Sequence, residues 1–328
     1  MTDKINLYFE KDALERFILD EYNLKNLLAI ISGHSVLCMN MTEADIEKEW
    51  KSSSLSGQRG GSKIQKFCTG HNLKRPKSAS TVFQNINNNS QELLNFSRSV
   101  FFLNITPSEA ESLRKKYGVM VISKDNISDN IFQFHIKDSV RKNEKKNGCV
   151  DGWDYFFGMR KHEWLPSNAL VVSDDHLFDN NQNKVNLGVR NLKSLITHLL
   201  PQKFDEEYQI LVVSQVPKNN VALAKKISDE LSQYIQDLSL SYICKITFVF
   251  SKATHTRKII SNYYIMTCDK GFSVYLNNPQ NQVHDTNFVD ITSVFHSAAD
   301  SVGTSGYDDA TICLQELKKN CIEAQSQV

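Results

Sequence analysis

A histidine and an arginine separated by one residue are the side chains in this sequence best suited to chemistry on a phosphate group. His255 and Arg257 belong to the stretch THTRKIISN, which ends at Asn262. On an extended strand, side chains two positions apart point to the same face. There an imidazole can act as a nucleophile or proton donor, and a guanidinium can bind two phosphate oxygens at once. Asn262 can donate to a phosphate oxygen, but it cannot balance an imidazolium charge as a carboxylate would.

Two carboxylates elsewhere in the sequence are candidates for that missing charge. Asp174 and Asp175 follow the apolar stretch ALVVS, which is typical of a buried strand. Open α/β sheets bind ligands at the carboxyl ends of their strands, so either residue could reach a site there. An equally good interpretation is that both belong to a loop that caps the next element.

The segment resembles the phospholipase-D superfamily, whose signature is His-x-Lys, four residues and Asp, followed by a glycine-containing strand. This chain has Arg257 at the Lys position and Asn262 at the Asp position, and Gly271-Phe272 follow. The pattern is more similar to the phospholipase-D-like C-terminal domain of microtubule-interacting-and-trafficking proteins. The resemblance covers about residues 165–276 and implies a phosphate site at His255 and Arg257. Active members combine two His segments, which here implies a homodimer or a second half that the sequence does not reveal.

The elements before His255 alternate between strand and helix. Apolar runs predict strands, and apolar residues at helical spacing predict helices between them. The hairpin after the third strand carries His255. The expected order is strand 168–173, helix 188–201, strand 208–215, helix 221–238, strand 244–252 and hairpin 254–276.

The N-terminal half shows the same alternation, which is typical of a parallel α/β sheet. The charged segment 137–152 is the best linker candidate. We therefore expect an α/β protein with two α/β domains, at 1–145 and 152–328. The second would be phospholipase-D-like, with a mixed sheet flanked by helices and a C-terminal helical tail.

Residues 51–91 look like a long basic insertion, rich in Ser and Gly, with no acidic residue before the end of that range. Its cations could follow a nucleic-acid backbone, with Phe67 and His71 stacking on bases. A solvated, disordered loop is the alternative. The nucleic-acid-binding candidates are Arg59, Lys63, Lys66, Lys74, Arg75 and Lys77.

Acidic residues near predicted strand ends in the N-terminal half faintly resemble a PIN-type metal nuclease. Asp12, Glu43 and Asp125 are the candidates for binding Mg²⁺ or Mn²⁺. Acids at helix starts are also ordinary partners of the helix dipole. No cofactor is expected unless this resemblance holds.

The composition argues against a strongly charged protein, a membrane-spanning protein and a disulfide-rich protein. The chain has 328 residues, a formal net charge of +1 and 41% hydrophobic residues, so any basic surface must be local. No apolar run reaches the roughly 18 residues that a membrane span needs. The seven cysteines show no C-x-x-C pair, which favours reduced thiols in a cytoplasmic protein over disulfides or zinc.

Three hypotheses about function follow. The first is a nucleic-acid-handling protein, a phosphodiesterase or nuclease of a bacterial antiviral defence system, acting on DNA or RNA through His255 and Arg257. The second is an inactive phospholipase-D-like module that binds phosphate or protein partners in a larger assembly. The third is a metal-dependent, PIN-like nuclease in the N-terminal half. None involves a membrane, and the first implies a homo-oligomer.

Overall fold

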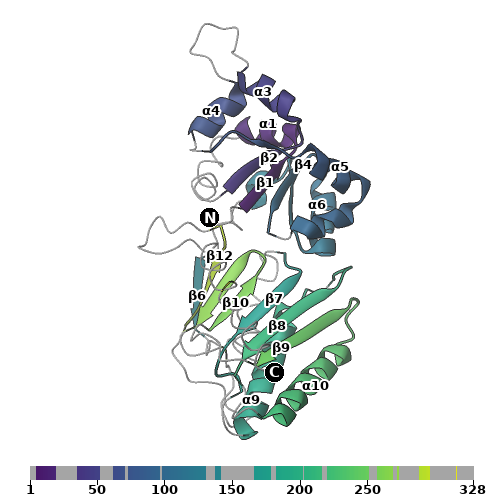
Figure 1. The fold of residues 1–328 in the computed structure, drawn as a ribbon, viewed down its shortest axis with the longest axis vertical. Helices are drawn as coiled ribbons and strands as arrows, with labels where there is room; N and C mark the ends of the chain where they lie inside the picture. The colour runs from purple at the N-terminus through teal and green to yellow at the C-terminus, as the bar shows by residue number, and fades with distance from the viewer. Residues whose placement is uncertain are drawn as a thin grey trace. The chain divides into compact units, whose positions relative to one another are not determined.

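The computed structural model describes most of the chain, and the statements below concern those residues alone. They are 5–19, 35–51, 62–70, 73–96, 98–130, 137–141, 166–178, 182–201, 203–215, 220–250, 257–268, 272, 288–295 and 315. The chain forms two compact units (Figure 1). The first contains Met1–His135 and Phe295–Ser305, and the second contains Ile136–Val294 and Gly306–Val328.

The first unit is built on a parallel sheet with the strand order β3-β2-β1-β4-β5. Residues of the adjacent inner strands β1 and β4 are almost all buried, as expected for a parallel sheet covered on both faces. The strands are β1 (Ile5–Phe9), β2 (Ser35–Met39), β3 (Lys77–Ser78), β4 (Val100–Leu103) and β5 (Met120–Ser123). The described helices are α1 (Lys11–Leu19), α3 (Glu43–Lys51), α4 (Lys63–Gly70), α5 (Ser80–Asn88), η1 (Ser90–Phe96), α6 (Pro107–Tyr117) and α7 (Ile127–Asn130).

Aromatic pairs fix the register between β1 and β4 on both faces of this sheet. Tyr8 stacks on Phe101 with ring centroids 4.6 Å apart, and Phe9 stacks on Phe102 at 4.1 Å. Phe17 of α1 meets the Phe9 and Phe102 rings edge to face. Such pairs add to the stability gained from apolar burial alone. The strand–helix alternation predicted for this half is therefore confirmed as an α/β fold.

The segment 51–91 is not one long mobile insertion, as its composition suggested. Its described residues form α4, β3 and α5, and they contribute to the core of the unit. Ile64, Phe67 and Cys68 of α4 are buried, as is Phe83 of α5. The apolar residues of α4 stand at helical spacing among Lys and Gln, so a short amphipathic helix is hidden within a basic composition.

The second unit has a mixed seven-stranded sheet with the order β6-β12-β11-β10-β7-β8-β9. Strands β7, β8 and β9 are parallel, and the remaining pairs are antiparallel. The strands are β6 (Lys137–Arg141), β7 (Ala169–Ser173), β8 (Tyr208–Ser214), β9 (Cys244–Phe250), β10 (Lys258–Ser261), β11 (Tyr264–Cys268) and β12 (Phe288–Ser293). Helix α9 (Gln182–Leu199) connects β7 to β8, and α10 (Val221–Asp237) connects β8 to β9. The expected mixed sheet flanked by helices is present.

The charged segment 137–152 does not begin as a linker. Its first five residues, Lys137–Arg141, form the edge strand β6, which pairs antiparallel with β12. A polar, charged strand is tolerated at the edge of a sheet because one side faces solvent. The rest of the segment lies outside the described residues. Within the described part of the chain, no helix is both long enough and apolar enough to cross a membrane.

Helix α9 approaches the loop after β7 unusually closely, at Gly188. A Cβ atom on Gly188 would lie 1.8 Å from the carbonyl oxygen of Leu177 and 3.1 Å from Cδ1 of Phe178. The contacting atom is backbone, so it cannot swing aside as a side chain could. Glycine at this position therefore holds the loop 174–178 against α9.

We expect Gly188→Ala to destabilise the second unit by about 1–3 kcal/mol through overpacking. Differential scanning calorimetry should show one transition shifted to lower temperature. Gly70→Ala is the matched control, because a Cβ at Gly70 would meet nothing within 4 Å. An unchanged thermogram for Gly188→Ala would contradict the close approach.

Candidate phosphate-binding site

The carboxyl ends of β7 and β8 and the start of β10 meet at one edge of the second sheet. Ser173, the last residue of β7, is in register with Lys258 at the start of β10 and with Val213 near the end of β8. Because β10 runs antiparallel to β7, Arg257 comes to the position where Asp174 leaves β7. The topology thus brings together residues that are 83 positions apart in the sequence.

Asp174 connects four segments of the chain at this edge. Its side-chain Oδ1 accepts from the backbone N–H of His176 at 2.9 Å, and Oδ2 accepts from the N–H of Phe272 at 3.0 Å. Its carbonyl oxygen accepts from the hydroxyl of Ser214 at 2.7 Å. The Nε of Arg257 lies 3.8 Å from Oδ1. Asp174 therefore shapes the loop, as one of its two interpretations predicted, and it also faces Arg257.

Burial decides what this carboxylate can do. The Asp174 side chain is 2% exposed, whereas that of Arg257 is 21% exposed. A buried carboxylate is costly unless hydrogen bonds and a counter-charge compensate it. The two N–H donors and Arg257 provide that compensation. In the described part of the chain, Asp174 is the one ion-pair partner of Arg257.

The guanidinium of Arg257 is thus paired with a buried carboxylate and is itself partly exposed. Its Nε carries one of the five N–H groups of an arginine, and this is the atom nearest Asp174. The two Nη groups can also form paired hydrogen bonds to phosphate oxygens. A partly exposed arginine at the carboxyl ends of parallel strands stands where open α/β sheets bind ligands.

Asp175 and His176 follow Asp174 in the same loop and differ in exposure. Asp175 is buried, with 6% exposure, and His176 is exposed. His255 lies outside the described residues, two positions before Arg257. The sequence predicted that His255 and Arg257 share one strand. In the structure Arg257 lies immediately before β10. The position of His255 beside it stays a prediction.

The structure does not bring Asn262 to this edge. Asn262 follows the last residue of β10, so it lies at the opposite end of that strand from Arg257. Its Oδ1 accepts from the N–H groups of Asn168 and Ala169 at 2.9 and 3.4 Å. Its Nδ2 donates to Oδ1 of Asn168 at 2.9 Å. With 7% exposure, Asn262 fastens the start of β7 and is not available to a phosphate at Arg257.

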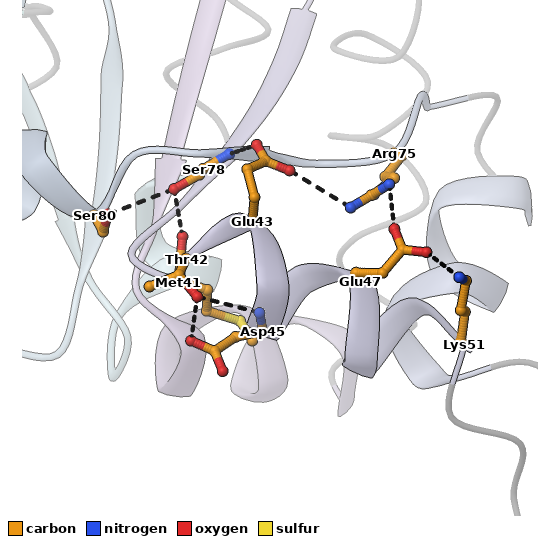
Figure 2. A network of polar contacts seen from close by, with 9 residues as sticks. All are labelled: Met41, Thr42, Glu43, Asp45, Glu47, Lys51, Arg75, Ser78 and Ser80. Carbon is orange, nitrogen blue, oxygen red and sulfur yellow. Dashed lines mark hydrogen bonds and ion pairs between the residues drawn. The ribbon is translucent and has the colours of Figure 1, made fainter.

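The basic residues predicted to bind nucleic acid lie on the first unit and divide into two groups. Lys63, Lys66, Lys74 and Lys77 are exposed, and Arg59 lies outside the described residues. Arg75 instead forms ion pairs with Glu43 at 3.5 Å and Glu47 at 2.5 Å (Figure 2). Phe67 is 8% exposed and packs edge to face on Phe17, so it cannot stack on a base.

Glu43 and its neighbours form a structural network. Glu43 Oε1 accepts from the N–H of Ser78 in β3 at 3.0 Å, and Oε2 faces Arg75 (Figure 2). The pKa of Glu47 is lowered, first by the hydrogen bond from Lys51 and further by Arg75. This network fastens the short strand β3 to α3, which explains why so short a strand is held in place.

The three acidic residues proposed for a metal do not converge. Glu43 lies beside β3, Asp12 follows β1 and accepts from Asn104 at 3.0 Å, and Asp125 follows β5 and pairs with Lys124 at 3.0 Å. β3 and β5 are the two outer strands, four strand spacings apart, or about 19 Å at 4.8 Å each. A single ion cannot bridge that span. Within the described residues, no group of three His, Cys, Asp or Glu side chains could hold a metal ion.

We compared the sequence with known protein families and with curated proteins. The sequence matches no protein family, and no curated protein is significantly similar to it.

We expect Asp174→Ala to be strongly destabilising, by about 2–5 kcal/mol, because it leaves buried N–H donors and Arg257 without their acceptor. Asp174→Asn keeps one acceptor oxygen, so its loss should be smaller. The thermal unfolding temperatures should fall from the unaltered protein to Asp174→Asn and then to Asp174→Ala. Equal stability of all three would show that Asp174 does not connect these segments.

Proposed function

We propose that the second unit binds a phosphate group of DNA or RNA at Arg257. The observation that carries this proposal is the arrangement of Arg257 over the buried Asp174. The carboxylate lies 3.8 Å from the guanidinium Nε, and the arginine stays partly exposed. A positioned arginine loses less conformational entropy on binding than a free one.

The proposal extends to chemistry through His255. In the hypothesis, its neutral imidazole attacks the phosphorus, the bond to one ester oxygen breaks, and that oxygen takes a proton from solvent water. This gives a phosphohistidine and a free hydroxyl end. Water then hydrolyses the phosphohistidine and restores the imidazole. Arg257 stabilises the negative charge that develops on the phosphate oxygens. No metal takes part in either step.

The order of the elements supports the resemblance to phospholipase-D-like proteins. Strand β7, helix α9, strand β8, helix α10 and strand β9 precede the segment that contains His255 and Arg257. That order is the one on which the resemblance was based. Asp174, on the strand next to β10, supplies a carboxylate that the motif itself lacks. The hypothesis places the protein in the cytoplasm, in a bacterial antiviral defence system.

A second candidate is binding without cleavage. The position of Asn262 favours it, because the residue at the signature's Asp position stabilises the start of β7. The same Arg257 site would then recognise phosphate within a larger assembly. The two candidates differ only in turnover, so one set of experiments separates them.

Arg257→Ala should weaken binding of a fluorescein-labelled oligonucleotide by about 10- to 100-fold, the value of one charged hydrogen-bonding group. The slope of log affinity against log salt should fall by about 1. Arg257→Lys should restore part of the affinity, since it keeps the charge and loses the paired geometry. Lys225→Ala, which removes an exposed charge on α10, is the control and should bind normally. Unchanged binding by Arg257→Ala would end the proposal.

Cleavage of single- and double-stranded DNA and RNA should persist in EDTA and be lost, by at least about 100-fold, in His255→Ala. Binding without cleavage by the unaltered protein would select the second candidate. Cleavage that EDTA abolishes would contradict the metal-free steps at His255.

A further inference from the structure

Strand β9 is an open edge of the second sheet. In the described part of the chain it pairs with β8 and forms the end of the strand order. None of its seven residues is buried, whereas five of the seven residues of β8 are. The side chains of Phe248 and Phe250 stack with ring centroids 5.7 Å apart and stay partly exposed. This edge is long, regular and apolar.

The two edges of the sheet differ in how they are protected. Strand β6, with the sequence KDSVR, has three charged residues in five, which discourages pairing with another strand. Strand β9, with the sequence CKITFVF, has one charge in seven, at Lys245, and neither Pro nor Gly. Proteins usually blunt such edges, so an unprotected one is expected to have a partner strand.

Alternate residues of β9 direct their backbone N–H and C=O groups away from β8. Tyr208 donates its N–H to the carbonyl of Ile243 at 2.8 Å. Backbone groups alternate along a strand, so Lys245, Thr247 and Val249 also point toward β8. The N–H and C=O groups of the alternate residues therefore point away from the sheet. They belong to Cys244, Ile246, Phe248 and Phe250.

We propose that β9 pairs antiparallel with β9 of a second copy of this chain, about a twofold axis at Thr247. In this register Ile246 lies opposite the partner's Phe248, and Cys244 lies opposite the partner's Phe250. All four outward-facing residues then exchange paired N–H···O bonds. A twofold interface requires such self-complementarity, because the same surface serves both copies.

The side chains fit the same register. Apolar residues meet apolar residues on one face, and on the other Lys245 lies opposite the partner's Val249. Thr247 meets itself, a favourable cross-strand pair, and no like charges are opposed. A foreign strand would have to match this pattern by chance, whereas a second copy matches it by symmetry.

The two Arg257 residues of such a dimer lie far apart, whatever Arg257 binds. The carboxyl ends of the two paired β9 strands point in opposite directions, about 20 Å apart for six residue-to-residue steps of about 3.3 Å each. The dimer would therefore keep two separate Arg257 edges and would not combine two His255 segments into one site.

Charge substitution at Thr247 tests the register. Light scattering coupled to size exclusion should give the unaltered full chain twice the 37.4 kDa of one copy. Thr247→Lys and Thr247→Glu each oppose like charges across the axis, so each should elute as a single chain. Their equimolar mixture should recover the doubled mass, since Lys then faces Glu. Gln236→Lys, at an exposed position on α10, should stay dimeric.

A single-chain mass for the unaltered protein across a micromolar concentration series would overturn the proposal. So would a dimer that persists in both Thr247 variants, or a mixture of the two that fails to recover the doubled mass. Circular dichroism shows whether each variant is folded. Since Thr247 is exposed, its substitution should leave the spectrum unchanged.

Discussion

The second unit depends on compensating one buried carboxylate. Asp174 is almost removed from water, and a carboxylate there is stable only if its oxygens are hydrogen-bonded and its charge is balanced. Its partners come from the loop after β7, from the residues after β11, from the end of β8 and from the start of β10. The requirement to satisfy Asp174 therefore holds these segments together, and it pairs the carboxylate with Arg257, which is partly exposed.

The first unit obeys a different constraint, which is apolar. Its inner strands carry adjacent aromatic residues, so each of the two faces receives one stacked pair. Helices must cover both faces, and even the basic segment 62–70 contributes buried residues to that cover. The polar groups near the carboxyl ends of its strands mostly satisfy one another, as Asp12 and Asn104 do. That mutual satisfaction explains why acids that look suitable for metal binding in the sequence act here as local structural partners.

The success of sequence reasoning varied with the range of the interaction. Helix α6 was predictable because Pro107, Gly118 and the Thr106–Glu109 capping box are all local signals. Helix α4 was missed because its few apolar residues were outweighed by Lys, Ser and Gly nearby. Arg257 and Asp174 were each identified by type and by position relative to a strand. Their contact, however, follows from β10 running antiparallel beside β7, which no local pattern encodes. For the same reason the sequence could not show that Asn262 lies at the far end of β10.

The stacked pairs of the first unit also bear on how the chain folds. Phe9 and Phe102 are in register but stand 93 positions apart in the sequence. Closing so large a loop costs conformational entropy before the contact contributes any stabilising free energy. Folding rates therefore fall as contacts become less local. During synthesis, β1 must wait for β4 to emerge from the ribosome, and among the described strands β2 is its one neighbour until then. The aromatic residues that later stabilise this core are exposed in the meantime, so transient chaperone binding to this unit would limit its aggregation.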